Sequence, residues 1–137
     1  MKKSIFIALA ALSVAFPVSV SASETRCGWY GNTTPGNWWL TDSEAQWTIA
    51  AQLGFQAQGM NNLPQIDNMQ KILTSRNNFY GYGCACLEVE TDKSTNRITM
   101  IYGSEALPLS TCRNDPNLPS DPYSSLDQKL ISMQFCK

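Results

Sequence analysis

The sequence contains no histidine. Histidine is the side chain that most often serves as a general base near neutral pH, and it is the commonest ligand of transition metals in proteins. Its absence argues against a histidine-based nucleophilic centre and against a histidine-bound metal. We therefore expect no metal and no cofactor.

Clusters of Lys and Arg are also absent. The chain has ten basic and eleven acidic residues, and removing an N-terminal leader that carries Lys2 and Lys3 leaves eight basic residues and a net charge of about −3. Nucleic acids and anionic bilayers attract proteins through clustered positive charge. Neither nucleic acid nor a membrane is expected as a partner of the mature chain.

No apolar run reaches the ~20 residues that a membrane-spanning helix needs. The apolar, uncharged stretch at residues 5–16 is shorter, follows Lys2 and Lys3, and is broken by Pro17. The small residues that end at Ala22 resemble a signal-peptidase site. The sequence thus predicts a signal peptide at residues 1–22 and a periplasmic or secreted mature protein.

All five cysteines follow the predicted cleavage site, so in an oxidising compartment they should form disulfides. Cys84 and Cys86 share one face of a predicted strand, because strand side chains alternate. Each is therefore expected to pair with a different partner, Cys27 or Cys112, in an order that the sequence leaves open. Cys136 is the candidate for the odd thiol.

The hydrophobic pattern predicts a β-rich α+β fold. Strands are expected at residues 47–56, 79–90 and 97–102, in a small antiparallel sheet or partly closed barrel stapled by disulfides. One or two short helices are expected, near residues 67–73, with Met69, Ile72 and Leu73 turned inward, and in the C-terminal segment 125–133. A single domain at residues 23–115 would precede a Pro-rich linker and short helix at 116–137. The predicted core comprises Trp47, Ile49, Leu53, Leu87, Val89, Ile98 and Met100.

Every tryptophan lies between residues 29 and 47, in a stretch rich in turn-forming residues. Aromatic faces beside side-chain amides suit the C–H faces and hydroxyls of a sugar, and they equally suit a protein partner. The alternative is that these rings form the core of a small domain. The candidate binding residues are Trp29, Tyr30, Asn32, Asn37, Trp38 and Trp39.

Asp42 and Glu44 are the candidates for acid–base chemistry. Two carboxylates near aromatic rings are found in glycosidases. However, acids at a turn or helix start are commonly there for capping, and this is the default interpretation.

Three stretches together resemble a family of small exported bacterial proteins known as domain of unknown function 4087. They are RCGWYGNTTPGNWWLTD at residues 26–42, YGYGCACL at 80–87 and ALPLSTCRND at 106–115. The resemblance implies that these segments belong to one domain, and it implies no activity, substrate or catalytic residue.

The leading functional hypothesis is a non-enzymatic periplasmic binding module. Its partner would be an envelope glycan or an exported protein, as for an inhibitor or immunity-type protein. A structural envelope component is the alternative, and a hydrolase that uses Asp42 or Glu44 is a weaker one.

Overall fold

A computed structural model describes residues 11–17, 22–75 and 79–122. Residues 11–17, within the predicted signal peptide, form neither helix nor strand and are exposed along their length. Across the described ranges, no helix is long and apolar enough to cross a membrane. The predicted C-terminal helix at 125–133 and Cys136 lie outside the described residues.

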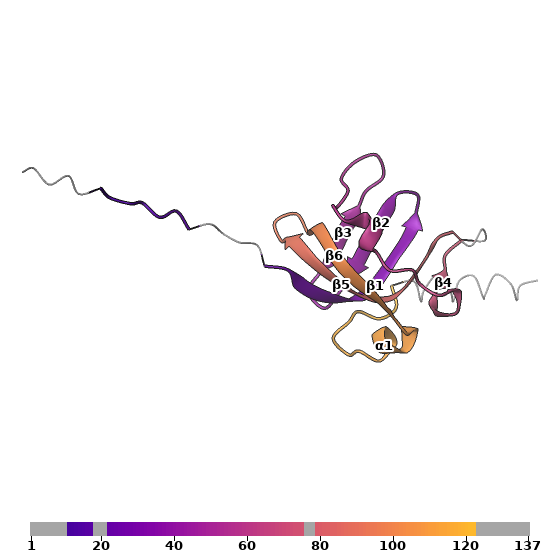
Figure 1. The fold of residues 1–137 in the computed structure, drawn as a ribbon. Coiled ribbons are helices and arrows are strands. Elements are labelled where there is room, and N and C mark those ends of the chain that lie inside the picture. The colour runs from indigo at the N-terminus through magenta and orange to yellow at the C-terminus, as the bar shows by residue number, and fades with distance from the viewer. Residues whose placement is uncertain (1–10, 18–21, 76–78, 123–137) are drawn as a thin grey trace, which may run out of the picture.

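Six strands and three short helices follow one another along the chain (Figure 1). The strands are β1 (Glu24–Thr34), β2 (Asn37–Thr41), β3 (Gln46–Ala50), β4 (Ile72–Leu73), β5 (Gly81–Asp92) and β6 (Arg97–Leu107). Two 3₁₀ helices, η1 (Met60–Asn62) and η2 (Asn68–Gln70), precede β4, and the α-helix α1 (Leu109–Arg113) follows β6. The turn between β1 and β2 has Gly36 at a φ of 69°, a conformation that glycine adopts without strain.

The six strands form one sheet in the order β1-β2-β3-β6-β5-β4, and an additional pairing of β1 with β5 closes β1, β2, β3, β6 and β5 into a ring. Strand β4 lies outside this ring and pairs with the start of β5. The contact between β3 and β6 is parallel and brief, with Thr48 opposite Arg97, whereas the other strand pairings are antiparallel. The expected β-rich α+β class is confirmed.

The larger hydrophobic cluster lies inside the ring. Every strand of the ring contributes residues to this cluster. Side chains from all strands of a closed sheet can meet one another only on its inner face. Strand alternation then assigns the even-numbered residues of β1 to the inner face, because Tyr30 belongs to this cluster. Its buried members are Tyr30, Leu40, Trp47, Ile49, Ala57, Ala85, Leu87, Val89, Ile98 and Ile101.

A smaller cluster lies on the outer face of β1, β2 and β5, where α1 covers the sheet (Figure 1). Trp29, Trp39 and Tyr82 form its aromatic part, with Cys84 and Cys112 beside them. Leu118 packs against this cluster, and the Trp29 indole Nε1 donates to the carbonyl of Pro119 at 3.0 Å. The segment after Pro116, assigned to a linker from its proline content, therefore packs on the domain at least in part.

Two disulfides join the outer face, Cys27–Cys86 and Cys84–Cys112. Cys27 and Cys86 face each other across β1 and β5, so their bridge links neighbouring strands. Cys84 reaches α1 and fixes it to the sheet. Each of the two neighbouring cysteines thus has a different partner, as their shared strand face requires.

The strand predicted at 47–56 ends at Ala50. The chain turns through residues 51–55, where the Gly54 amide donates to the carbonyl of Ala51 at 3.1 Å. Leu53 adopts a positive φ of 58° at this turn and is fully exposed, so its predicted place in the core is wrong. Turn formation has overridden the period-two pattern of the sequence.

Three further details differ from the sequence prediction. Irregularities in the register of β5 against β6 shift the inward positions, so Ile101 is buried while Met100 is only half-buried. The helix expected at 67–73 is the single turn η2, capped as expected by the Asp67 side chain. Met69 and Leu73 are exposed instead of turned inward, whereas Ile72 packs against the outer cluster. The helix α1 was not expected.

Candidate functional site

A pocket of about 260 Å³ opens at the end of the ring where β1 and β2 meet. Its walls come from residues of these two strands, from the start of β5, and from the segment before β4 that crosses this end of the ring. The lining residues are Tyr30, Gly31, Asn32, Trp38, Pro64, Gln65, Ile66, Lys71, Gly81 and Tyr82.

Glycines of β5 allow the crossing segment to lie close to the sheet. A Cβ at Gly81 would lie 2.4 Å from the carbonyl oxygen of Ile72, and a Cβ at Gly83 would lie 2.9 Å from a methyl of Ile66. Both glycines therefore mark a close approach of another part of the chain to this strand. Without them, the wall that carries Ile66 and Lys71 would be displaced.

Tyr30 and Trp38 form the aromatic side of the pocket. Their rings stack with centroids 5.9 Å apart and planes inclined by 29°. Tyr30 is almost fully buried, and burial raises the pKa of its hydroxyl. Trp38 is half-buried, packing against the inner core with the rest of its ring accessible.

Polar atoms of this pocket have no hydrogen-bond partners among the described residues. They are the hydroxyl of Tyr30, the indole N–H of Trp38 and the Oδ1 of Asn32. The Nδ2 of Asn32 is occupied, because it donates to the carbonyls of Thr34 and Asn37. In the described chain, Thr74 Oγ1 is the one fully enclosed side-chain polar atom without a partner, so these three atoms are in contact with solvent.

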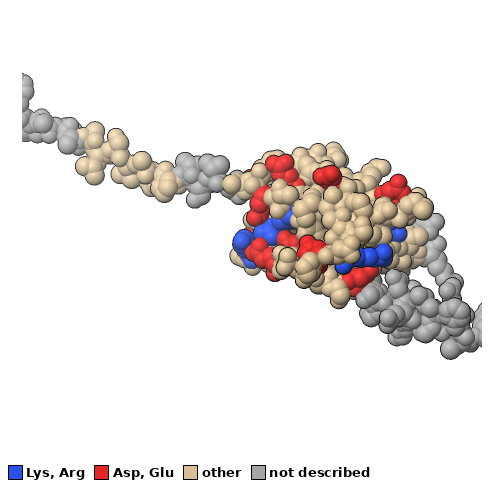
Figure 2. All heavy atoms as spheres, turned by 90° about the horizontal axis from the view of Figure 1, so that it is seen from below, with Lys and Arg blue, Asp and Glu red and all other residues tan. Residues whose placement is uncertain are grey.

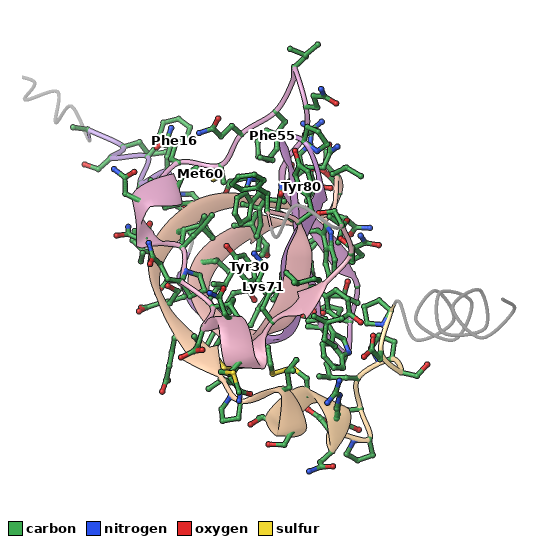
Figure 3. All side chains as sticks on the ribbon, turned by 90° about the vertical axis from the view of Figure 1, so that its right-hand side faces the viewer. Phe16, Tyr30, Phe55, Met60, Lys71 and Tyr80 are labelled. Atoms are coloured by element: carbon green, nitrogen blue, oxygen red, sulfur yellow. A yellow bond between two sulfur atoms is a disulfide. The ribbon has the colours of Figure 1, made fainter. Side chains whose placement is uncertain are left out.

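Among the described lining residues, Lys71 carries the only charge. Its side chain passes over Gly81, and its Nζ makes one long contact of 3.4 Å with the carbonyl of Phe79. Tyr30 and Lys71 lie close together in the view through this end of the ring (Figure 3). The pocket therefore combines an aromatic wall, unpaired neutral polar groups and one cation.

The structure divides the candidate binding residues into two groups. Tyr30, Asn32 and Trp38 line the pocket. Trp29 and Trp39 are buried in the outer cluster, which is the core alternative that the sequence left open. Because strand side chains alternate, the adjacent Trp38 and Trp39 fall on opposite faces of β2.

Asn37 has a structural role in the turn between β1 and β2. Its Nδ2 donates to Thr34 Oγ1 at 2.7 Å and to the carbonyl of Pro35 at 3.2 Å. Its Oδ1 accepts from the amide of Gln52 at 2.9 Å. Asn37 shapes the rim and is not one of the residues that line the pocket.

The candidate carboxylates surround Arg26, far along β1 from the pocket. The Arg26 guanidinium donates to Asp42 at 2.7 Å and to Glu44 at 2.9 Å, contacts Glu24, and lies 4.0 Å from the ring centre of Trp47. Figure 2 shows acidic and basic side chains lying side by side on the face seen from below.

Asp42 is fully occupied by hydrogen bonds. Its Oδ1 accepts from the amides of Glu44 and Ala45 and from the Trp47 indole, and its Oδ2 accepts from Arg26. Burial alone would raise the pKa of Asp42, but these hydrogen bonds outweigh it and lower the pKa. Pairing with Arg26 and Lys93 also lowers the pKa of Glu44. A general acid needs a raised pKa, so this arrangement fits capping and ion pairing better than proton transfer.

The comparisons with known proteins give one family. The profile described as "Protein of unknown function (DUF4087)" matches residues 21–119. The chain belongs to this family. No curated protein and no solved structure matches the chain. The match to this family confirms the resemblance that the sequence carries and adds no activity or ligand to it.

The sequence analysis did not identify Lys71 or the segment around Ile66 as parts of the site. Gly81 and Gly83 were the available signal, because glycines at alternating strand positions indicate that another segment packs closely there. However, a glycine does not say which segment approaches it. Among the described residues, no group of His, Cys, Asp or Glu could hold a metal ion.

Proposed function

We propose that this protein is a non-enzymatic binding module, exported to the bacterial envelope, whose pocket holds one sugar ring of an envelope glycan. The observation that carries the proposal is the set of unpaired polar groups beside the Trp38 ring. These groups are reached by solvent and are not used by the fold, so a ligand can replace the water around them and take up their hydrogen bonds.

The chemistry of the pocket matches a sugar ring. The accessible part of Trp38 offers a flat apolar face to sugar C–H groups, and the aromatic stack with Tyr30 holds that face in place. The Tyr30 hydroxyl and the Trp38 N–H donate hydrogen bonds, and Asn32 Oδ1 accepts one. Ring hydroxyls both donate and accept, so a sugar complements all three.

The size of the pocket favours a single ring. Its volume of about 260 Å³ lies just below the ~300–1,000 Å³ of pockets for drug-sized molecules. A whole oligosaccharide would not fit, whereas a terminal or exposed residue of a longer glycan would. Export is supported by the N-terminal leader pattern and by the two disulfides, which persist in oxidising compartments.

A titration with soluble peptidoglycan fragments, followed by tryptophan fluorescence and calorimetry, tests the proposal. We expect saturable binding that Trp38→Ala reduces at least tenfold, since an aromatic anchor is worth about 2 kcal/mol or more. Tyr102→Ala is the matched control, because Tyr102 is an exposed aromatic residue outside the pocket lining. Absence of saturable binding to any saccharide, or equal loss in both variants, would contradict the proposal.

A protein partner is the second candidate, and one observation favours it. The segment that carries Lys71 also exposes the large apolar side chains of Met69 and Phe79, at 84% and 74% of their surfaces. Such residues anchor protein interfaces. Capture of an exported protein that is lost on Met69→Ser and retained on Trp38→Ala would replace the glycan with this alternative.

A further inference from the structure

We propose that the sugar ring held in this pocket carries an anionic substituent and that the Lys71 ammonium binds it. This inference rests on the proposed function, and it specifies the class of ligand within it. Its starting point is a contrast among the basic residues of the described chain.

Four of these residues have a charged or aromatic partner. Arg26 and Lys93 pair with carboxylates at 3.1 Å or less, Arg113 lies 4.0 Å from Asp121, and the Arg97 guanidinium lies 4.6 Å from the ring centre of Phe55. Lys71 has no ion pair within the described ranges. It is also the one residue of the five that lines the pocket.

The described residues of the pocket wall offer Lys71 no counter-charge, because no Asp or Glu occurs among them. The single contact of Nζ, 3.4 Å from a carbonyl oxygen, leaves most of the hydrogen-bonding capacity of the ammonium unused, since it carries three donors. An anionic group on the ligand would complete both the charge and the hydrogen bonds.

The position of Lys71 is defined by the fold. Its stem passes over Gly81, where a Cβ would come within 2.9 Å of the Lys71 Cε, and Ile72 next to it is paired in β4 with Tyr82 of β5. The ammonium therefore belongs to the same pocket that the stacked pair of Tyr30 and Trp38 lines. A sugar ring stacked on Trp38 with its anionic substituent toward Lys71 uses both the aromatic face and the cation.

Matched saccharides test the charge requirement. Glucose, glucuronic acid and glucose 6-phosphate differ only at the substituent on carbon 5, and N-acetylglucosamine and N-acetylmuramic acid form a second neutral and acidic pair. We expect each acidic sugar to bind on the order of 10- to 100-fold more tightly than its neutral parent, the range of a charge-assisted hydrogen bond. The carboxylate and phosphate arms identify which anion the site prefers.

Lys71→Met removes the charge and keeps the length of the side chain. We expect it to weaken the binding of acidic sugars far more than that of neutral sugars, so that the preference for acidic sugars is lost. Lys93→Met is the matched control, since it makes the same change in net charge at an exposed residue paired with Glu44. Lys71→Arg should restore most of the preference, and circular dichroism verifies that each variant is folded.

The outcomes separate this inference from the proposed function. Neutral sugars that bind as tightly as acidic ones, or a Lys71→Met variant that weakens both equally, would overturn the charge requirement and leave the sugar site intact. Acetate or phosphate alone that binds as tightly as the acidic sugars would also overturn it. Failure of all sugars to bind would overturn the proposed function and the inference together.

Discussion

Arg26 lies near the start of the inner face of β1, and Asn32 lies near its end. At the Arg26 end, every polar side chain has partners: the guanidinium contacts three carboxylates, and Asp42 accepts four hydrogen bonds. At the Asn32 end, the Tyr30 hydroxyl, the Trp38 indole N–H and Asn32 Oδ1 have no partners among the described residues. One strand face thus carries a complete polar network and an incomplete one.

The difference separates stability from function. A complete buried network holds elements together, and removing one partner leaves an uncompensated group at a high cost. A polar group that solvent reaches contributes little to stability and is free to form a hydrogen bond with a ligand. We therefore infer that the Arg26 end stabilises the fold and that the Asn32 end binds a ligand. Substitutions at the two ends test this distinction.

The largest effect is expected at the Arg26 end. Asp42→Ala removes the carboxylate that Arg26 and the Trp47 indole share inside the ring, and it should lower the free energy of unfolding by about 3–5 kcal/mol. Chemical denaturation measures this loss. Glu44→Ala is the control, because Glu44 is exposed and its loss should lower the free energy of unfolding far less. Similar losses in the two variants would mean that the network is not the closed structure described.

The adjacent tryptophans extend the comparison to the two faces of the sheet. Trp39→Ala leaves a cavity in the outer cluster and should lower the free energy of unfolding by about 3 kcal/mol or more. Trp38→Ala should cost less, since its ring is half-buried, while it reduces sugar binding. Thermal unfolding and calorimetry on the same samples distinguish the two. A larger loss of stability for Trp38→Ala would place this ring in the core and remove it from the site.

Acid should act at the Arg26 end. The pKa of Asp42 in the folded protein lies below its ordinary value, so the folded state binds this proton less readily than the unfolded state. The resulting stability is present above the unfolded pKa, near 4, and is lost as the pH falls through the folded pKa, at about 1.4 kcal/mol for each unit of difference. Denaturation between pH 2 and 6 should show this decline, reduced in Asp42→Asn. An unchanged profile in that variant would assign the decline to other carboxylates.

The smallest effect is expected from Tyr30→Phe. The hydroxyl has no partner to lose, so stability at pH 7 should change by no more than about 1 kcal/mol in either direction. Burial raises the pKa of Tyr30, so the wild type should lose stability as the pH rises above the ordinary value near 10, and the variant should lose less. A loss well above 1 kcal/mol at pH 7 would show that the hydroxyl belongs to a satisfied network, and the comparison would fail.

How far the sequence predicts this molecule depends on the range of the interactions involved. Strand alternation correctly gives β5, the shared face of Cys84 and Cys86, and the opposite faces of Trp38 and Trp39, because each is a local property of an extended chain. The same rule fails at Leu53, where a turn with a positive φ interrupts the pattern. It also fails at Met100, where irregular pairing with β5 shifts the inward positions.

The sequence predicted only part of the candidate site, because the other part depends on long-range contacts. Tyr30, Asn32 and Trp38 lie close together in sequence on two strands joined by a turn. Lys71 reaches them only through the ring closure and the approach of its segment to Gly81, which are long-range contacts. No local pattern in the sequence marks that lysine as different from the others.

Two indole N–H groups provide the most direct test of the account, since Trp47 belongs to the Arg26 end and Trp38 to the pocket. Their signals in a ¹⁵N–¹H correlation spectrum, recorded during titration with N-acetylmuramic acid, report on both ends at once. We predict that the Trp38 indole signal moves progressively to saturation, with the backbone amides of Gly31 and Asn32, while the Trp47 indole signal, bonded to Asp42, stays in place. Movement confined to Trp47, or no movement at either indole at saturating ligand, would contradict the assignment of binding to the incomplete end of the ring.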